Sequence, residues 1–433
     1  MSRVTAAEQR PVLGTRRLGP TLSALGVVVL AVAVRRLMFR DESDDYHYFL
    51  HPWYEQIRTH GGFGALKDSG FADYNVPYLY ILAGLTHLPV QDLAGIKAVS
   101  TLFDLLAAYL AHLIVALRHS ESSWRPPLAG AVVLFLPTVA TNSGWWGQAD
   151  SVYTVFVLGG VYCVLRRRPW WACAFLGVAL AFKLQAVFVL PFLLVLLLTR
   201  RVPWRALLAV PAAYLLLDVP ALLIGADPGR LLTVYARQTG TYQELTMNAP
   251  SVYQFLRAGD QADVVRQAGV LVTGVVVLTL TALVVLRGGG RARTRPASWG
   301  RPASWARELT GTQVVLLATA SAILVPFLLP SMHDRYFYLA DVLSVVAAFH
   351  LPDRLWSLPV LVQVASFGSY LQYLAPGVGQ YVKMEFFAAL MGLALLVVLR
   401  VTAGELRREP AAPPDAVVPA PAGEPVPPAR QRR

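Results

Sequence analysis

The sequence predicts an all-α polytopic membrane protein, a bundle of about 12 transmembrane helices with a site formed by its outer loops. Hydrophobic residues make up 55% of the 433-residue chain and charged residues only 15%, whereas soluble domains contain about 25% charged residues. The mean hydropathy is +0.49. Apolar runs close to the roughly 17–25 residues needed to cross the hydrocarbon recur along the chain, which places it in the membrane class.

The net charge of +12 is explained by membrane orientation. Most of the arginines stand in short clusters between apolar runs, which is typical of the cytosolic loops of membrane proteins. This distribution argues against a nucleic-acid partner. Cys163 and Cys173 both fall inside predicted spans, so no disulfide is expected.

The chain begins with a basic segment, residues 1–20, followed by a predicted first helix over Thr21–Val34. Ala31-Val32-Ala33 would also suit a signal-peptidase site. An uncleaved helix is favoured, because two arginines crowd that site. Three arginines follow this helix closely, Arg35, Arg36 and Arg40. We expect them to snorkel to lipid headgroups, with a phosphate site as the alternative.

The first long polar segment is Asp41–Tyr80, which belongs to a predicted outer loop over residues 41–94. Within this loop, Val76–Val90 is apolar but short and bounded by prolines. Its length fits an interfacial or re-entrant helix better than a crossing.

Eleven further apolar runs alternate in direction between arginine clusters, with both termini in the cytosol of a plasma-membrane protein. The runs are Gly95–Leu117, Pro127–Thr141, Ser151–Leu165, Trp170–Phe182, Ala186–Leu198, Leu207–Ile224, Val270–Leu286, Thr312–Leu329, Leu339–His350, Leu355–Leu374 and Phe386–Leu399. They complete a membrane domain over residues 21–400. Residues 287–309 are predicted as a basic cytosolic loop and 401–433 as a disordered Pro/Ala-rich cytosolic tail.

This arrangement places four polar, aromatic-rich stretches on the same outer side. They are Asp41–Tyr80, Gly144–Ser151, Tyr242–Tyr253 and Ser331–Tyr338. Among the ionisable residues inside spans, Lys97 and Asp104 are seven apart on one helix face, so we expect them to pair with each other or elsewhere in the bundle. Lys183, at the break in a helical pair, could instead reach an anionic ligand.

Asp44 and Asp45 are the candidate bases, because they stand among tyrosines and a tryptophan soon after the first helix. Aromatic surroundings raise the pKa of a carboxyl group towards values useful for proton transfer. The alternative is a solvated acidic loop beside an interfacial aromatic belt.

Two other outer stretches carry candidate ligand-binding groups. In GWWGQADS, Trp146, Gln148 and Asp150 could hold a polyhydroxylated ligand, although Asp150 could also cap the following helix. In SMHDRYFY, His333 and Arg335 suit phosphate, because arginine offers a bidentate fork. A local Asp334–Arg335 pair in a surface turn is the alternative.

These residues resemble the GT-C membrane glycosyltransferases over roughly residues 20–400. The likeness is carried by the order of the acidic outer loop, SGWWGQADS, FKLQ (Phe182–Gln185), LTMNAPSVY and MHDRYFY. It is greatest to the dolichyl-phosphate-glucose-dependent glucosyltransferases and their bacterial mannosyltransferase-like relatives.

The resemblance implies transfer of a hexose, mannose or glucose, from a polyprenyl-phosphate donor to a glycolipid, polysaccharide or protein acceptor outside the plasma membrane. It implies an inverting reaction with Asp45 as base and Asp44 as the fallback, and it places His333 and Arg335 at the donor phosphate. The remaining candidate substrate-binding residues are Lys183, Gln148, Asp150, Trp146, Asn248 and Tyr336. Gln-Ala-Asp replaces a paired-acid motif, so no metal ligands are assigned and a divalent cation stays only a possibility.

A transporter or flippase of a lipid-linked sugar is the rival interpretation. Transporters place their polar groups near the bilayer midplane, often in repeated halves. Here the polar stretches cluster at one face and the two halves do not repeat, so an enzyme is favoured. A non-catalytic scaffold would leave the one-sided cluster unexplained.

Overall fold

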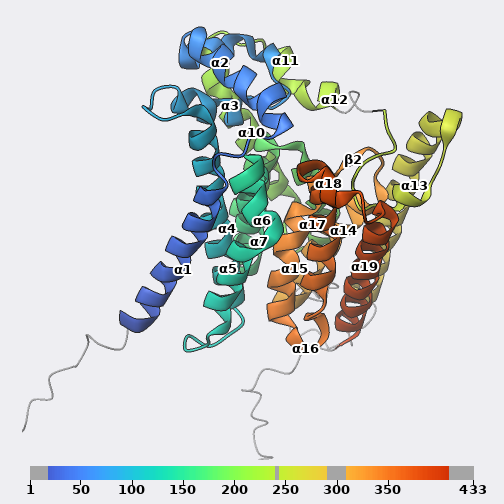
Figure 1. Cartoon of the computed structure of the whole chain (residues 1–433). Helices are drawn as coiled ribbons and strands as arrows, with labels where there is room; N and C mark the ends of the chain where they lie inside the picture. The colour runs from blue at the N-terminus through green and yellow to red at the C-terminus, as the bar shows by residue number, and fades with distance from the viewer. Residues whose placement is uncertain (1–17, 239–242, 290–308, 409–433) are drawn as a thin grey trace, which may run out of the picture.

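The computed structural model describes residues 18–238, 243–289 and 309–408, and these form a bundle of helices (Figure 1). The α-helices are α1 (Leu18–Leu37), α2 (His51–Thr59), α3 (Val76–Leu85), α4 (Asp92–Ala116), α5 (Arg125–Phe135), α6 (Pro137–Thr141), α7 (Asp150–Leu165), α8 (Pro169–Phe182), α9 (Leu190–Leu198), α10 (Ala209–Leu223), α11 (Pro228–Leu232), α12 (Val234–Gln238), α13 (Ala262–Gly289), α14 (Gly311–Leu328), α15 (Tyr338–His350), α16 (Pro352–Leu355), α17 (Leu358–Leu374), α18 (Pro376–Gly379) and α19 (Met384–Arg407).

Shorter elements lie mainly at the helix junctions. They are the π-helices η1 (Tyr46–Leu50) and η3 (Asn142–Trp146), the 3-10 helices η2 (Gly62–Phe71), η4 (Leu184–Val189), η5 (Trp204–Leu208), η6 (Val252–Phe255), η7 (Gly259–Gln261) and η8 (Asp334–Phe337), and the strands β1 (Thr246–Met247) and β2 (Met332–His333). The expected all-α polytopic class is therefore correct.

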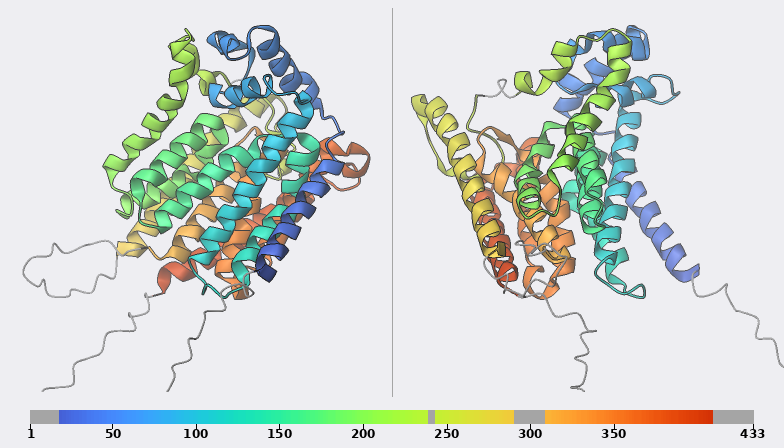
Figure 2. Two further views of the ribbon diagram at one scale, coloured as in Figure 1. Left: turned by 90° about the vertical axis from the view of Figure 1, so that its left-hand side faces the viewer. Right: turned by 180° about the vertical axis from the view of Figure 1, so that it is seen from behind.

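The long helices run side by side between two ends of the molecule, which we call the α2 end and the α16 end (Figures 1 and 2). The closest packing joins α7 to both α4 and α8, α4 to α5, α8 to α10, and α17 to α19. Alanine and valine at helix contacts, such as Ala107 and Val157, are fully buried. Small side chains of this kind let helices approach closely inside a membrane.

Five helices among the described residues are long and apolar enough to cross a bilayer, or six if the pair α5 and α6–η3, bent by 50°, is one span. Shorter apolar helices add to these, among them α3, α7 and α8. The number of about twelve crossings stays a prediction.

The helical pair α8 and α9 is interrupted where the sequence shows Lys183. This residue has an extended backbone, with φ −155° and ψ 135°, and the 3-10 helix η4 follows it. Proline at the starts of α8 and α9 fits the first turn of a helix, where no backbone N–H is needed. The break brings Lys183 to the level of the polar segments at the α2 end.

The predicted outer loop over residues 41–94 is mostly helical. It forms η1, α2, η2 and α3, and the side-chain oxygen of Asn75 caps α3 by accepting a hydrogen bond from the Val76 N–H. Aromatic side chains stabilise these helices, because Tyr46, Trp53 and Tyr54 are buried in a second apolar core at the α2 end.

Several expectations for individual segments need correction. Residues 401–407, predicted as the start of a disordered tail, belong to α19, and residues 287–289, predicted as the start of the basic loop, belong to α13. Residues 290–308 and 409–433 of these segments, and residues 1–17, lie outside the described residues.

Arg35 does not snorkel to lipid headgroups, since it is 1% exposed. Its Nε lies 2.8 Å from the Asp104 carboxylate, which also accepts hydrogen bonds from Ser143 and Tyr338. Lys97 does not pair with Asp104 and donates instead to the carbonyls of Met38 and Asp41. Both charges are thus satisfied within the bundle.

Candidate active site

A carboxylate at the α2 end, that of Asp45, is held by groups from three other segments. Its Oδ2 accepts a 2.9 Å hydrogen bond from Trp146 Nε1 and another from Gln148 Nε2. Its Oδ1 accepts one of 3.2 Å from the Tyr373 hydroxyl, and Arg335 Nη1 lies 3.2 Å from Oδ2. Asp45 is 15% exposed, so it is fixed in orientation yet open to a ligand.

Aromatic rings hold this arrangement together. Trp146 is fully buried and stacks on Tyr373 with 4.8 Å between ring centroids. The Arg335 guanidinium lies over the Trp146 ring at 5.3 Å. A cation on the face of a tryptophan is attracted by the ring quadrupole, so Trp146 orients both the acid and the cation.

A second acid, Asp150, is fully buried beneath this arrangement. Its Oδ1 accepts a 2.6 Å hydrogen bond from Lys183 Nζ, and its Oδ2 accepts one of 3.0 Å from Asn142. Asp150 is the first residue of α7 but makes no capping bond there, so the capping alternative is wrong. Arg335 Nε is 4.0 Å from Asp150 Oδ2, which sets this guanidinium between two carboxylates.

The local pair of Asp334 with Arg335, considered as the alternative to a phosphate site, does not form through the side chains. Asp334 instead accepts a hydrogen bond from the Arg335 backbone N–H. Desolvation raises the pKa of Asp334 to about 7, against the opposing charge of Arg335. Desolvation also lowers the pKa of His333 to about 2, helped by the charges of Arg335 and Lys183. His333 is therefore a neutral imidazole near pH 7.

The fourth polar stretch joins the others through a short parallel strand pair. Thr246 pairs with Met332 and Met247 with His333. Asn248 follows with a positive φ of 58° and bridges to His333. All four polar stretches predicted to share one side thus meet at the α2 end.

The candidate residues surround two adjoining hollows. One is lined by Asp45, Gln148, Lys183, His333, Arg335 and Tyr336, with Asp73, Tyr74, Gln185 and Gln238. The other has a volume of about 560 Å³ and shares Asp45, His333 and Arg335 with the first. Asp44, Glu244 and Asn248 also line it. Asp44 is exposed, unlike its neighbour Asp45.

The family model of glycosyltransferase family 87 matches residues 71–319, more than half of the chain. The chain belongs to glycosyltransferase family 87. No curated protein matches it. Among solved structures, the crystal structure of ArnT from Cupriavidus metallidurans bound to undecaprenyl phosphate is similar, with a TM-score of 0.51 and 14% identity over 89% of this chain and 78% of that one. This glycosyltransferase therefore has the GT-C fold, as the resemblance of its sequence motifs to GT-C enzymes implied.

The candidate site includes residues that the sequence did not single out. Tyr373 donates to Asp45 from the end of α17, and Asn142 supports Asp150 from η3. Gln185 and Gln238 line the hollow beside Tyr336. Gln185 stood in a segment already marked by the helix break, so its polarity in an apolar run was a usable signal. No comparable signal in the sequence marked Tyr373, because an aromatic residue at a helix end is common in membrane proteins.

Metal ligands do not gather in the described part of this glycosyltransferase. None of its His, Cys, Asp and Glu side chains form a group of three or more that could hold an ion. Asp45 and Asp150 are instead surrounded by hydrogen-bond donors and cations, an environment suited to anionic oxygen. A divalent cation stays an untested possibility.

Proposed function

We propose that this glycosyltransferase transfers a hexose, mannose or glucose, from a polyprenyl-phosphate-linked donor to a glycolipid, polysaccharide or protein acceptor, with inversion at the anomeric carbon. The reaction would take place on the extracytoplasmic side of the plasma membrane. The observation that carries the proposal is the contact between an acid, Asp45, and a cation, Arg335, in a cleft beside an apolar groove.

Arg335 offers a place for the donor phosphate. Its Nε is buried and makes no hydrogen bond to any described residue. A buried N–H of this kind is costly unless a ligand satisfies it, and guanidinium groups match phosphate oxygens in geometry and charge. Neutral His333 can contribute a hydrogen bond without adding charge. The undecaprenyl phosphate held by the similar ArnT structure supports this class of ligand.

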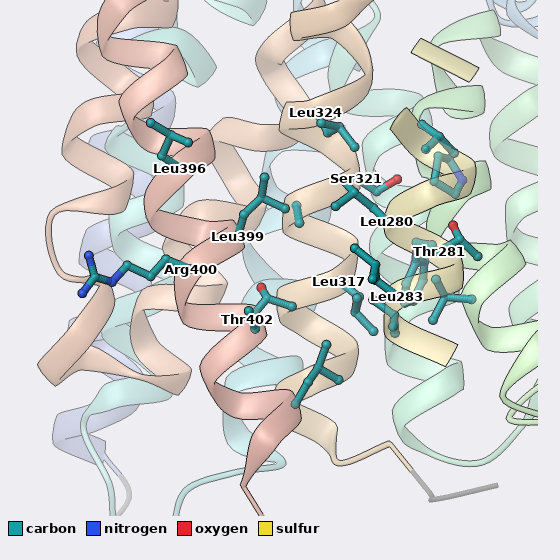
Figure 3. A pocket seen from close by; sticks show the side chains of 18 residues that line it. Leu280, Thr281, Leu283, Leu317, Ser321, Leu324, Leu396, Leu399, Arg400 and Thr402 are labelled. Atoms are coloured by element: carbon teal, nitrogen blue, oxygen red, sulfur yellow. The ribbon is translucent and has the colours of Figure 1, made fainter. Parts of the chain in front are cut away.

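The lipid chain of the donor has an apolar path away from Arg335. A hollow of about 440 Å³ shares Gln185, Gln238 and Tyr336 with the cleft and is lined further by η4 and α13. Beyond it, α9, α13, α14 and α19 enclose a second apolar groove of about 380 Å³ (Figure 3). We assign these two hollows to the prenyl chain, because the second presents mainly apolar side chains and the first adds apolar ones such as Val187, Phe188 and Leu329 beside its polar rim at the cleft.

The sugar would lie between the phosphate and Asp45. The side-chain carbonyl oxygens of Gln185 and Gln238 are buried without a hydrogen-bond partner among the described residues. Each can accept a hydrogen bond from a sugar hydroxyl. Neutral acceptors of this kind favour an uncharged hexose over a sugar that carries a carboxylate.

In the proposed reaction, Asp45 takes the proton of the acceptor hydroxyl as that oxygen attacks the anomeric carbon. The bond from that carbon to the phosphate oxygen breaks, and Arg335 stabilises the charge that develops on the leaving phosphate. Trp146, Gln148 and Tyr373 keep the Asp45 oxygens in place. Positioning of this kind lowers the entropic part of the barrier.

The decisive experiment compares Asp45→Asn with Asp44→Asn in a turnover assay with a polyprenyl-phosphate hexose. Loss of a general base costs about 10²–10⁴ in rate, so Asp45→Asn should be nearly inactive. Asp44→Asn should stay within a few fold of wild type, because its side chain is exposed. Thermal melts of both variants report whether they fold.

Full activity of Asp45→Asn together with loss in Asp44→Asn would move the base to Asp44. If neither substitution changes turnover, the catalytic role of this acidic pair is wrong. Transport of an intact lipid-linked sugar across vesicles, without transfer to an acceptor, would instead favour the flippase.

A further inference from the structure

The α16 end carries a second polar cavity, on the opposite face of the molecule from the cleft. Its volume is about 570 Å³, and it lies where α4, α5, α15, α16 and α19 begin or end. Four arginines from four different segments line it, and they are Arg118, Arg125, Arg354 and Arg408. We propose that this cavity binds the phosphate of an anionic membrane lipid.

Two basic side chains of the cavity are held in place by backbone carbonyls. Arg118 Nε donates to the carbonyl oxygen of His350 at 3.1 Å, and His119 Nε2 lies 3.0 Å from that of Phe349. These contacts join the end of α4 to the end of α15. A guanidinium fixed in this way loses less side-chain entropy when it binds an anion.

The positive charge of the cavity is only partly neutralised. Arg354 and Arg408 share a single acid, Glu405, each with a nitrogen 2.9 Å from the same oxygen. Arg125 makes no ion pair with any described residue, and the only acid on the wall is Asp353. A bound anion would neutralise the remaining charge, and arginine forks bind phosphate oxygens bidentately.

The surroundings favour a lipid headgroup over a soluble phosphate. Trp124 and Trp356 flank the cavity in sequence and are 66% and 71% exposed. Exposed tryptophans of membrane proteins gather at the level of the headgroups. Basic pockets between transmembrane helices on the cytosolic side are a known way to hold anionic headgroups. Cytosolic arginines that only set the orientation of the helices need not face one another. The four arginines here converge on one cavity, which orientation alone does not explain.

The test uses the full chain purified in detergent with phosphatidylcholine and titrated with phosphatidylglycerol, with bound lipid counted by native mass spectrometry. Wild type should retain one phosphatidylglycerol tightly. Arg125→Gln/Arg354→Gln should bind it at least about tenfold more weakly, because each charged hydrogen bond lost is worth about that factor. Arg166→Gln, an exposed arginine at the same end but outside the cavity, serves as the matched control.

Equal retention by wild type and the double variant would overturn the site and leave these arginines with an orienting role alone. Stabilisation by inorganic phosphate, with no preference between phosphatidylglycerol and phosphatidylcholine, would overturn the lipid assignment. Melting temperatures in phosphatidylcholine check folding. Arg354→Gln alone replaces the double variant if that one unfolds, since Glu405 keeps Arg408 as a partner.

Discussion

Arg335 has two tasks in the proposed reaction, and His333 has one. Arg335 holds Asp45 and offers Nε to the phosphate, whereas neutral His333 is assigned a single task, one hydrogen bond donated to the phosphate. His333→Ala should therefore raise the KM for the donor and leave the KM for the acceptor unchanged. Arg335→Ala should lower both donor affinity and turnover, with a loss of about 1.5–3 kcal/mol for the phosphate contact alone.

Steady-state kinetics with each substrate varied in turn would measure this difference. Arg230→Ala, at an exposed arginine paired with Asp68 at the α2 end, is the control and should change neither constant. Equal effects of His333→Ala on donor and acceptor would contradict the assignment of the donor phosphate to this histidine.

Asp334 gives the site a pH-dependent stability. Burial holds its pKa at about 7, above the value of about 3.9 for an unfolded chain. The native carboxyl thus keeps a proton that the unfolded one has released. Its contribution to the free energy of unfolding is fully present below about pH 4 and is lost as the pH rises to about 7.

Asp334→Asn removes this titration. We therefore expect the melting temperature of the variant, relative to wild type, to increase between pH 4 and pH 7, as measured by thermal melts at several pH values. A difference that stays constant over this range would mean that Asp334 is not protonated in the native protein.

At the scale of the elements, the break between α8 and η4 lets Lys183 reach Asp150 at the start of α7. Both side chains are almost fully buried, and their nitrogen and oxygen are 2.6 Å apart. Removing one partner of a buried ion pair costs about 3–5 kcal/mol, because the other charge stays uncompensated. Lys183→Met and Asp150→Asn should each lower the melting temperature markedly.

The double variant Lys183→Met/Asp150→Asn should be more stable than the sum of the single effects predicts, since it leaves neither charge behind. Melting temperatures of wild type, the two single variants and the double variant complete this double-mutant cycle. Strictly additive losses would mean that Lys183 and Asp150 do not depend on one another in the folded protein.

Some elements could be predicted from the sequence and others could not. The helix break was visible because a lysine and a glutamine interrupt an apolar run. Within residues 41–94, the sequence predicted a helix at Val76–Val90, where α3 lies, but not η1, α2 and η2, because Tyr46, Trp53 and Tyr54 become buried only through contacts made on folding. Arg35 was misread for the same reason, since its partner Asp104 lies on another helix. The local sequence pattern predicts that a segment is helical, but it does not predict which other helices that segment contacts.

For the whole molecule, the direction of successive helices predicted that four polar stretches share one end. They do meet around Asp45 and His333, although the membrane side of that end stays a prediction. Single cysteines at exposed positions test it with an impermeant thiol reagent on intact cells. Tyr48→Cys in η1 and Tyr381→Cys just after α18, both at exposed positions, should react from outside.

Ser122→Cys, exposed between α4 and α5 at the α16 end, should react only after the membrane is opened. The native Cys163 and Cys173 are buried and give the background signal. Labelling of Ser122→Cys from outside in intact cells would reverse the proposed orientation, so that the candidate active site would face the cytosol.

The Arg35–Asp104 pair also constrains how the protein is made. The two residues are 69 positions apart, and ribosomes add about 5–20 residues each second. Arg35 therefore waits roughly 3–14 s after its own synthesis before its partner exists. During that interval α1 carries an uncompensated guanidinium, which must stay near water or the insertion machinery. We therefore expect the first helix to reach its final depth only after α4 has been inserted, which would impose an order on the biogenesis of this glycosyltransferase.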